Sequence, residues 1–447
     1  MDTKRETFYR YFFRIYVALV LQNVVTLSVN LTDNIMLGAY SETALAGVTA
    51  VNQIQFIYQQ LLMALGDGLV MFCSQYWGKK ETEPIRRIAS LALRIALGLA
   101  AVLFVAVSIW PREMLSFFTT DQPIIEQGAG YLRIVRFTYV FFAVTQLMLA
   151  SLRSVETVRI AFYMSIMTFF INCGINYALI FGNLGAPALG AQGAAIGTLC
   201  ARVVECAVIL WFVFRRDRKL CLRPGDLMGS GRGLWKPYIR QTAPMALLSG
   251  LWGLNTALQT AILGHMTPAA IAANSAASTL YLLVKSTAVG ASSTAAVIIG
   301  KAIGAGDIDL VKSYSKRMQR LFLMIGICSG VLLFFLRIPV LSLYDLRPET
   351  RERADHVLMI LRVVCMGLSY QRPTNGGIIR GGGSSMFVVK EDLISIWGIV
   401  VPLSLIMAFV VKASPEVVVI CLNADQVFKC LPAYLKANHG NWIKKLA

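Results

Sequence analysis

The sequence predicts an all-α integral membrane protein, with twelve transmembrane helices arranged as two parallel six-helix lobes. Three observations support this fold class: an apolar composition, apolar stretches of membrane-spanning length along the whole chain, and a second half that repeats the first. Of the 447 residues, 56% are hydrophobic and 15% charged, against about 45–50% and about 25% in soluble domains. A soluble fold of this composition would have too few polar groups to cover its surface.

Twelve apolar stretches of the chain are long enough to cross a bilayer. A hydrocarbon core about 30 Å thick needs about 20 helical residues. The second and eighth stretches exceed that length, so we expect them to protrude from the membrane or to tilt. The predicted spans are residues 13–37, 45–76, 92–110, 130–152, 160–182 and 191–214 in the first half, and residues 242–264, 269–300, 320–338, 356–379, 393–412 and 415–435 in the second.

The most polar connection, RRDRKLCLRPGDLMGSGRGLWKPYIR, follows the sixth span. Its glycine, proline and basic residues are typical of a linker. We therefore expect an N-terminal lobe (1–214), an inter-lobe linker (215–241) and a C-terminal lobe (242–447).

Lysine and arginine gather on one side of the predicted topology. Cytoplasmic loops of membrane proteins are enriched in these residues, and this bias sets the orientation of the chain. With the N-terminus in the cytoplasm, basic loops such as 78–87 and 215–219 fall on the cytoplasmic side, and few basic residues remain outside. Both termini are thus predicted to be cytoplasmic. The net charge of +18 then reflects topology rather than a nucleic-acid partner.

The two halves of the chain share an internal repeat. A shift of 226 residues aligns LTDNIMLGAYSETALAGVTA (31–50) with ALQTAILGHMTPAAIAANSA (257–276) without a gap, and the register holds to Gly78 and Gly304. Six spans per half is an even number, so the halves have the same orientation and are parallel repeats. That arrangement is typical of transporters and predicts a substrate cavity between the lobes, opened by alternating access.

Four polar residues lie at similar depth in the outer half of the first lobe. Ionisable groups inside a span are costly and mark functional sites by default. Asp33 lies about five residues before the outer end of the first span, which is roughly 7 Å deep at 1.5 Å per residue. Asn172 and Asn176 share one face of the fifth span, and Thr198 lies in the outer part of the sixth.

These four residues form a candidate cation-coupling site with more than one chemistry open to it. A carboxylate with amide and hydroxyl neighbours can hold Na⁺ through oxygen atoms, with Asp33 and Asn176 as the metal ligands. Alternatively, burial favours the protonated carboxyl and makes Asp33 a proton carrier. The structural alternatives are a helix cap for Asp33 and interhelical hydrogen bonds for Asn172, Asn176 and Thr198.

A lysine near the middle of the eighth span has no basic counterpart in the first lobe. Lys285 aligns with Gln59 in the repeat, and both are candidate cavity residues. Lys285 can pair with a carboxylate, contact an anionic substrate or extend its ammonium group to the membrane surface. Arg202 and Glu205, three residues apart in the sixth span, are expected to neutralise each other.

The sequence lacks the motifs of nucleotide, metal and catalytic sites. GxxxxGK[ST], HExxH and GxSxG do not occur, so a P-loop or a common hydrolase site is not predicted. The nine cysteines form no CxxC pair, which argues against a metal or redox framework. We therefore expect no enzyme activity and no cofactor, and an energy-coupled step must draw on an ion gradient.

Segments in both halves resemble the MATE (multidrug and toxic compound extrusion) transporters in order and spacing. The resemblance covers nearly the whole chain. The matching segments are TDNIMLG (32–38), SQYWGKK (74–80), FINCGINYALIFG (170–182) and LGAQGAAIGT (189–198) in the first lobe, and QTAPM (241–245), VIIGKAIGAGD (297–307) and IIRGGG (378–383) in the second.

This resemblance implies a fold, an activity and a site. The family folds into two six-helix lobes that form a V, and its members export cationic, amphipathic compounds in exchange for H⁺ or Na⁺. Asp33 matches the family's first-helix aspartate. Asn172, Asn176 and Thr198 match polar positions associated with its first-lobe cation site.

The chain departs from the family at three places. One branch carries a glutamate in the seventh helix and an aspartate in the tenth, where Trp252 and Ser384 stand here. The second-lobe cation site of that branch is therefore expected to be absent. Another branch bends its first helix at a proline, and residues 13–37 contain none.

The sequence thus predicts an ion-coupled multidrug efflux antiporter of the bacterial inner membrane. We expect a monomer whose partners are a small cationic or amphipathic substrate and membrane lipid. One rival is a flippase of a lipid-linked sugar in the same superfamily, for which Lys285 and Arg372 would supply a cationic cleft. A second rival, an integral-membrane enzyme, lacks a catalytic constellation and fits the parallel repeat poorly.

Overall fold

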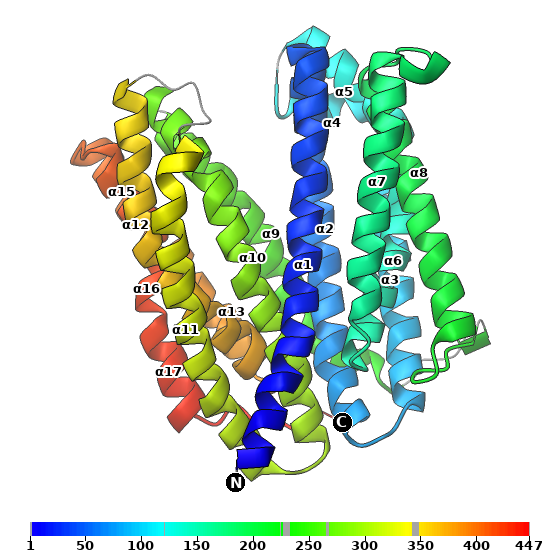
Figure 1. Ribbon diagram of the computed structural model, residues 1–447, viewed down its shortest axis with the longest axis vertical. Helices are drawn as coiled ribbons and strands as arrows, with labels where there is room; N and C mark the ends of the chain where they lie inside the picture. Colours follow the sequence, from blue (N-terminus) through cyan, green and yellow to red (C-terminus); the bar gives the residue numbers. More distant parts are fainter. Residues whose placement is uncertain are drawn as a thin grey trace. The chain divides into compact units, whose positions relative to one another are not determined.

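The computed structural model describes a helical chain, in which no described residue belongs to a strand (Figure 1). It describes residues 1–447 except 1, 120, 224, 227–232, 265–267, 342–347 and 447. The α-helices are α1 (Asp2–Tyr40), α2 (Glu42–Gly78), α3 (Glu83–Ile109), α4 (Pro111–Ser116), α5 (Gln122–Val135), α6 (Thr138–Ser154), α7 (Arg159–Phe181), α8 (Ala191–Trp211), α9 (Trp235–Gly264), α10 (Pro268–Gly304), α11 (Ile308–Leu341), α12 (Pro348–Arg372), α13 (Ser385–Asp392), α14 (Val401–Leu405), α15 (Pro415–Asn423), α16 (Asp425–Phe428) and α17 (Cys430–His439).

Most predicted spans are present as long apolar helices. Within the described parts of the chain, nine helices are long and apolar enough to cross a membrane, and the bent pair α5 and α6 adds a tenth. The long helices α9 and α12 occupy the predicted seventh and tenth spans. The all-helical membrane fold is thereby confirmed. α2 and α10 have 37 residues each, well above the length that a bilayer requires.

The fourth predicted span is not one straight helix. α5 and α6 meet at an angle of 56°, with the break at Arg136 and Phe137. There the Arg136 guanidinium donates to Ser108 Oγ at 3.0 Å and lies over the rings of Phe104 and Phe137. Neither of the usual breakers, glycine and proline, stands at this position, so apolar periodicity could not reveal the bend.

Two spans of the second half widen into π-helix beside a proline. η4 (Pro373–Ile379) continues α12, and η5 (Leu393–Val400) and η6 (Ile406–Val410) flank α14, which contains Pro402. Proline cannot donate a backbone hydrogen bond, and π-bulges inside helices often occur at functional sites. The widened turn of η4 holds the buried polar residue Asn375.

Contacts divide the chain into two compact units. The N-terminal unit comprises residues 21–73 and 81–242. The C-terminal unit comprises residues 1–20, 74–80 and 243–447. The lobe boundaries expected from the sequence stay a prediction.

The described part of the predicted linker packs within the N-terminal unit. Lys219 Nζ donates to the carbonyl of Val155 at 2.7 Å. Arg86 Nε donates to the carbonyl of Leu220 at 2.8 Å. These bonds satisfy backbone carbonyls that no helix ladder covers, so the basic residues of the linker also have a structural role.

In the C-terminal unit, the ends of α2 and α10 cross at repeat-equivalent glycines. The two helices begin and end 226 residues apart. A Cβ atom added to Gly304 would overlap the carbonyl oxygen of Gln75, and one added to Gly78 would overlap that of Lys301. Gln75 and Lys301 are also repeat equivalents. Small residues permit this close approach of helix backbones in membranes.

The residues after α17 pack onto the same end of α2. The Gln75 side chain donates to the Lys444 carbonyl at 3.1 Å and accepts from the Leu446 amide at 2.8 Å. The Lys444 amide donates to the Gly382 carbonyl at 2.8 Å. Trp442 is buried and its ring covers Gly382. The glycine-rich turn after η4 therefore allows the residues that follow α17 to pack closely against it.

Candidate cation-coupling site in the N-terminal unit

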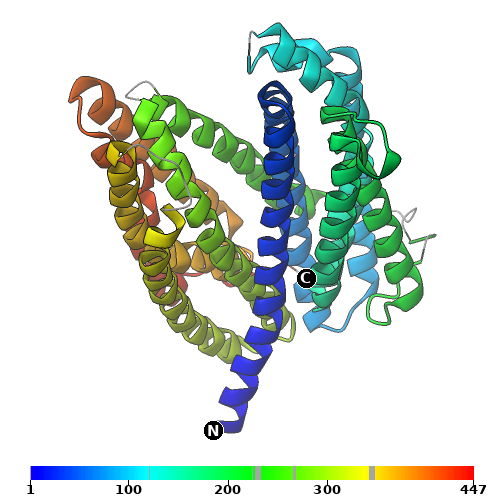
Figure 2. The ribbon, with the colours of Figure 1, turned by 45° about the horizontal axis from the view of Figure 1, so that its top comes forward.

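Asp33 lies on α1 about two turns before the helix ends at Tyr40. α1 is a single helix of 39 residues (Figures 1 and 2), as expected for a stretch without proline. The Asp33 side chain is half-buried, and its Oδ1 accepts a hydrogen bond from Asn176 Nδ2 at 2.7 Å. A residue of α1 is thereby tied to α7, 143 residues further along the chain.

The remaining predicted site residues continue from this bond as a polar chain. Asn176 Nδ2 also donates to Asn172 Oδ1 at 3.2 Å, one turn earlier on α7. Asn172 Nδ2 donates to Thr198 Oγ1 on α8 at 3.5 Å. Asn172 and Asn176 are 2% and 0% exposed. The structure therefore brings together Asp33, both asparagines and Thr198, which the sequence placed at similar depth.

One oxygen of this chain has no donor. Asn176 Oδ1 is buried and has no hydrogen-bond partner among the described residues. It points at Gly197 of α8, where an added Cβ atom would overlap it. Buried polar atoms are rarely left unsatisfied. The space that Gly197 leaves open therefore accommodates the acceptor oxygen of the amide that donates to Asp33.

Two neighbours of the site were not identified as site residues from the sequence. Arg202 Nη1 contacts Glu205 Oε2 at 2.7 Å, which confirms the expected pair, but its guanidinium also acts electrostatically on Asp33. Tyr131 of α5 is buried and lies beside Thr198. Arg202 follows Thr198 by one helical turn, a signal that the sequence offered. Nothing in the sequence connected Tyr131 to α1.

The chemistry of these groups suits a small hard cation or a proton. Carboxylate, amide and hydroxyl oxygens are the ligands that hard cations prefer. The Asp33 carboxylate and the unpartnered Asn176 Oδ1 have that character and keep lone pairs available. A carboxylate in this partly buried position can equally take up a proton, which removes the cost of burying its charge.

Lys285 and Gln59, the other predicted cavity residues, belong to different units. Lys285 of α10 places Nζ 4.2 Å from the ring centroid of Trp252 on α9. This cation–π contact involves the position at which one branch of the family carries a glutamate. Gln59 is half-buried on α2.

Known proteins resemble this chain along most of its length. The family model MatE matches residues 18–178 and 244–425. The probable multidrug resistance protein NorM of Thermotoga maritima is 24% identical over 425 residues, which cover 95% of this chain and 91% of that protein. The probable multidrug resistance protein YoeA of Bacillus subtilis is 25% identical over 409 residues, which cover 89% and 86%.

Solved structures share the fold at low sequence identity. An aspartate-to-asparagine mutant of the Vibrio cholerae MATE transporter VcmN has a TM-score of 0.89 at 16% identity, over 97% of each chain. A MATE in complex with MaL6 has a TM-score of 0.87 at 16% identity, over 96% of this chain and 95% of that one. With the family match across both halves, this likeness shows that the chain belongs to the MatE family and is a membrane transporter rather than an enzyme.

Proposed function

We propose that this protein is an ion-coupled multidrug efflux antiporter, which exports cationic amphipathic compounds in exchange for H⁺ or Na⁺ by alternating access. The observation that carries this proposal is the 2.7 Å hydrogen bond from Asn176 Nδ2 to Asp33 Oδ1. This bond connects the carboxylate of α1 to α7, and through Asn172 to Thr198 of α8. An ion that binds at Asp33 therefore acts on three helices together.

Ion binding at Asp33 would change which groups donate and which accept. An ionised carboxylate only accepts hydrogen bonds, whereas a protonated one also donates. Na⁺ would occupy the same carboxylate lone pairs, with Asn176 Oδ1 as a second ligand. Either ion weakens the attraction between Asp33 and the Asn176 amide and allows α1 to shift against α7. This shift is the proposed link between the ion gradient and substrate release.

The substrate class is inferred from the relatives. NorM and YoeA are both described as probable multidrug resistance proteins, and cationic amphipathic compounds are the substrates that the family resemblance implies. We propose that the protein works as a monomer in contact with membrane lipid. In this proposal transport needs no cofactor, because the gradient of the coupling ion supplies the energy.

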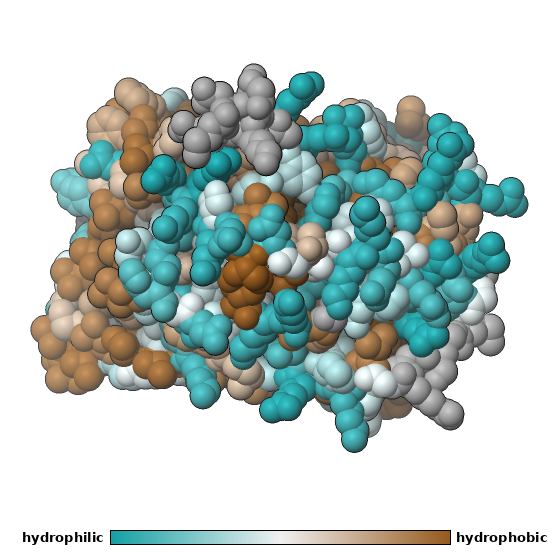
Figure 3. Space-filling model, turned by 90° about the horizontal axis from the view of Figure 1, so that it is seen from below, coloured by the Kyte–Doolittle hydropathy of each residue, from teal (hydrophilic) through white to brown (hydrophobic). Residues whose placement is uncertain are grey.

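We further propose that both termini face the cytoplasm of a bacterium, with the protein in the inner membrane. Hydrophilic side chains are spread over the face in Figure 3, which is Figure 1 seen from below, and hydrophobic ones gather at its left edge and near its centre. Exposed lysines stand in the loop after α2 and at the start of α11 (Lys79, Lys80, Lys312 and Lys316). Basic residues of short loops favour the cytoplasmic side.

Everted membrane vesicles with separately imposed H⁺ and Na⁺ gradients test the proposed transport. In this orientation the vesicle lumen corresponds to the cell exterior. A cationic fluorescent dye should therefore accumulate inside when the lumen is acidic or rich in Na⁺, and the effective gradient identifies the coupling ion. If accumulation equals that of vesicles without the protein under both gradients, antiport is excluded.

Gly197→Ala should impair coupling without a change to any ionisable group. The new methyl group would overlap Asn176 Oδ1 and push the Asn176 amide away from Asp33. We expect most gradient-driven dye accumulation to be lost. Gly174→Ala is the matched control, because a Cβ atom there, between the two asparagines of α7, meets nothing within 4 Å. Equal transport by the two variants would contradict the proposed role of Asn176.

A second candidate function rests on Lys285. A lysine held on the ring of Trp252 can meet an anionic group, as a flippase of a lipid-linked sugar would need. A MOP superfamily transporter from Pyrococcus furiosus shares the fold (TM-score 0.85, 15% identity, 96% and 94% coverage), and the reverse polarity of its binding pocket is described as suggesting a different function. Envelope defects on depletion, without drug sensitivity, would favour the flippase.

A further inference from the structure

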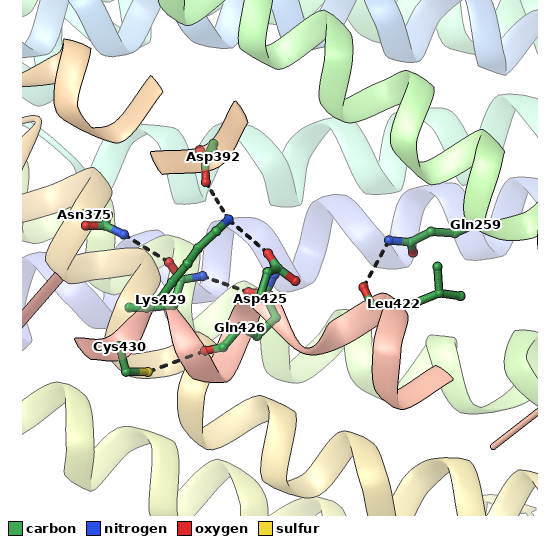
Figure 4. A network of polar contacts seen from close by, with 9 residues as sticks. Gln259, Asn375, Asp392, Leu422, Asp425, Gln426, Lys429 and Cys430 are labelled. Atoms are coloured by element: carbon green, nitrogen blue, oxygen red, sulfur yellow. Dashed lines mark hydrogen bonds and ion pairs between the residues drawn. The ribbon is translucent and has the colours of Figure 1, made fainter. Parts of the chain in front are cut away.

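A second polar network lies inside the C-terminal unit, around Lys429 at the junction of α16 and α17 (Figure 4). Lys429 Nζ donates to Asp392 Oδ1 at 2.6 Å and to Asp425 Oδ2 at 3.0 Å. The side chains of Lys429 and Asp425 are 3% and 5% exposed. Two aspartates thus share one lysine, and the three groups retain one uncompensated negative charge.

Neutral amides extend this network towards η4. Gln426 Nε2 donates to Asp425 Oδ2 at 2.6 Å, and Gln371 Nε2 donates to Gln426 Oε1 at 2.8 Å. Asn375 Nδ2 in turn donates to Gln371 Oε1 at 3.4 Å (Figure 4). At the end of this chain Asn375 is 3% exposed, and its Oδ1 has no donor among the described residues.

Glu391 is the unsatisfied acid beside this network. It is 9% exposed, and neither of its carboxylate oxygens has a hydrogen-bond partner in the described parts of the chain. Its carboxyl group lies beside Asn375 and within electrostatic range of Asp392, Asp425 and Lys429. Because the two aspartates already share Lys429, an ionised Glu391 would add a second uncompensated charge to the interior.

The other cations near this network have different environments. Lys285 of α10 and Arg372 of α12 act on each other, and Lys285 also acts on Asp425; its ammonium group lies over a tryptophan ring. Lys436 of α17 lies over the ring of Phe387. Lys390, next to Glu391 on α13, is exposed. Lys429 is the cation that acts electrostatically on Glu391, and it is already shared by two aspartates.

A proton would remove the buried charge of Glu391 and supply a hydrogen-bond donor beside Asn375, whose Oδ1 has none among the described residues. A protonated carboxyl group is neutral and has one O–H donor. Burial of an ionised carboxylate without partners is strongly unfavourable. We propose that Glu391 is a proton-binding site of the C-terminal unit, separate from Asp33. Release breaks the carboxyl O–H bond and passes the proton to water, and the carboxylate then adds to the negative charge that Asp392, Asp425 and Lys429 already carry together.

For its role in transport this site rests on the ion-coupled mechanism proposed above, but its protonation can be measured without transport. Infrared difference spectra of the full chain in lipid vesicles, acidic minus alkaline, report the carbonyl band of protonated carboxylic acids. We expect a titrating band in the wild type that disappears in Glu391→Gln and reappears at a shifted position in Glu391→Asp. A band that Glu391→Gln leaves unchanged would overturn the proposal.

Further variants separate this site from Asp33 and from surface acids. The Glu391 band should persist in Asp33→Asn. The proposal for Glu391 therefore stands even if ion coupling at Asp33 is refuted. Glu352→Gln, at an exposed acid of α12, should leave the band in place. If added Na⁺ abolished the band at constant pH, Glu391 would bind Na⁺ in place of a proton, and the proposal would also be overturned. If Glu391→Gln fails to fold, as judged by size-exclusion chromatography, the shift in Glu391→Asp decides.

Discussion

Asp33→Asn is expected to abolish gradient-driven export while substrate binding persists. Asparagine keeps an acceptor oxygen for Asn176 Nδ2, which in the wild type lies 2.7 Å from Asp33 Oδ1, so the polar chain can stay assembled. It cannot bind or release a proton, and it offers Na⁺ no charge. Dye accumulation in everted vesicles should fall to the level of vesicles without the protein. Dye binding to the purified variant, measured by fluorescence polarisation, should change little.

Asp121→Asn is the matched control for this experiment. Asp121 is an exposed residue of the N-terminal unit that precedes α5, and asparagine is an equally good residue at a helix N-terminus. The control should transport at the wild-type rate. Full gradient-dependent export by Asp33→Asn would refute coupling at this carboxylate, whichever ion drives it.

Gly304→Val is expected to destabilise the C-terminal unit strongly, and more than Gly250→Val. A Cβ atom at Gly304 would overlap the carbonyl oxygen of Gln75, and the atoms it meets are backbone rather than flexible side chain. Helix backbones would have to separate, at a cost of about 1–3 kcal/mol or more by analogy with overpacked cores. The variant should melt at a lower temperature in detergent and give less monodisperse protein.

Gly250→Val separates the clash from the intrinsic cost of valine in a helix. Gly250 lies on α9 in the same unit, and a Cβ atom there meets nothing within 4 Å. Both variants carry the same change in helix propensity. Equal melting temperatures for Gly304→Val and Gly250→Val would show that the crossing of α2 and α10 tolerates a wider separation.

The proximity of the four residues around Asp33 could be predicted from the sequence because its signals were local. Span length follows from runs of apolar residues, and the spacing of Asn172 and Asn176 fixes a common helix face. Similar depth in three spans was then enough to place Asp33 and Thr198 in the same region. The bond between Asp33 and Asn176 depends on how α1 packs against α7, which no local pattern contains.

The second network was missed because it follows from tertiary packing and uses other positions. The expectation that the second-lobe cation site of one branch of the family is absent rested on Trp252 and Ser384, where that branch has acids. The acids of this chain lie instead on α13 and α16, and Lys429 joins Asp392 and Asp425 across 37 and 4 residues. The pair Asp425 and Lys429, four apart within a predicted span, was the sequence signal that could have indicated it.

The crossing of α2 and α10 resembles an isologous dimer interface, although both helices belong to one polypeptide. In a two-fold symmetric dimer, residue i contacts residue j and j contacts i. Here Gly78 meets Lys301 as Gly304 meets Gln75, so the duplicated helix ends meet as those of two identical subunits would. The equivalent positions make different contacts: Gln75 is hydrogen-bonded to the last residues of the chain, while Lys301 lies over the ring of Tyr11 near its beginning. Two repeat-equivalent positions thereby contact the two ends of the polypeptide.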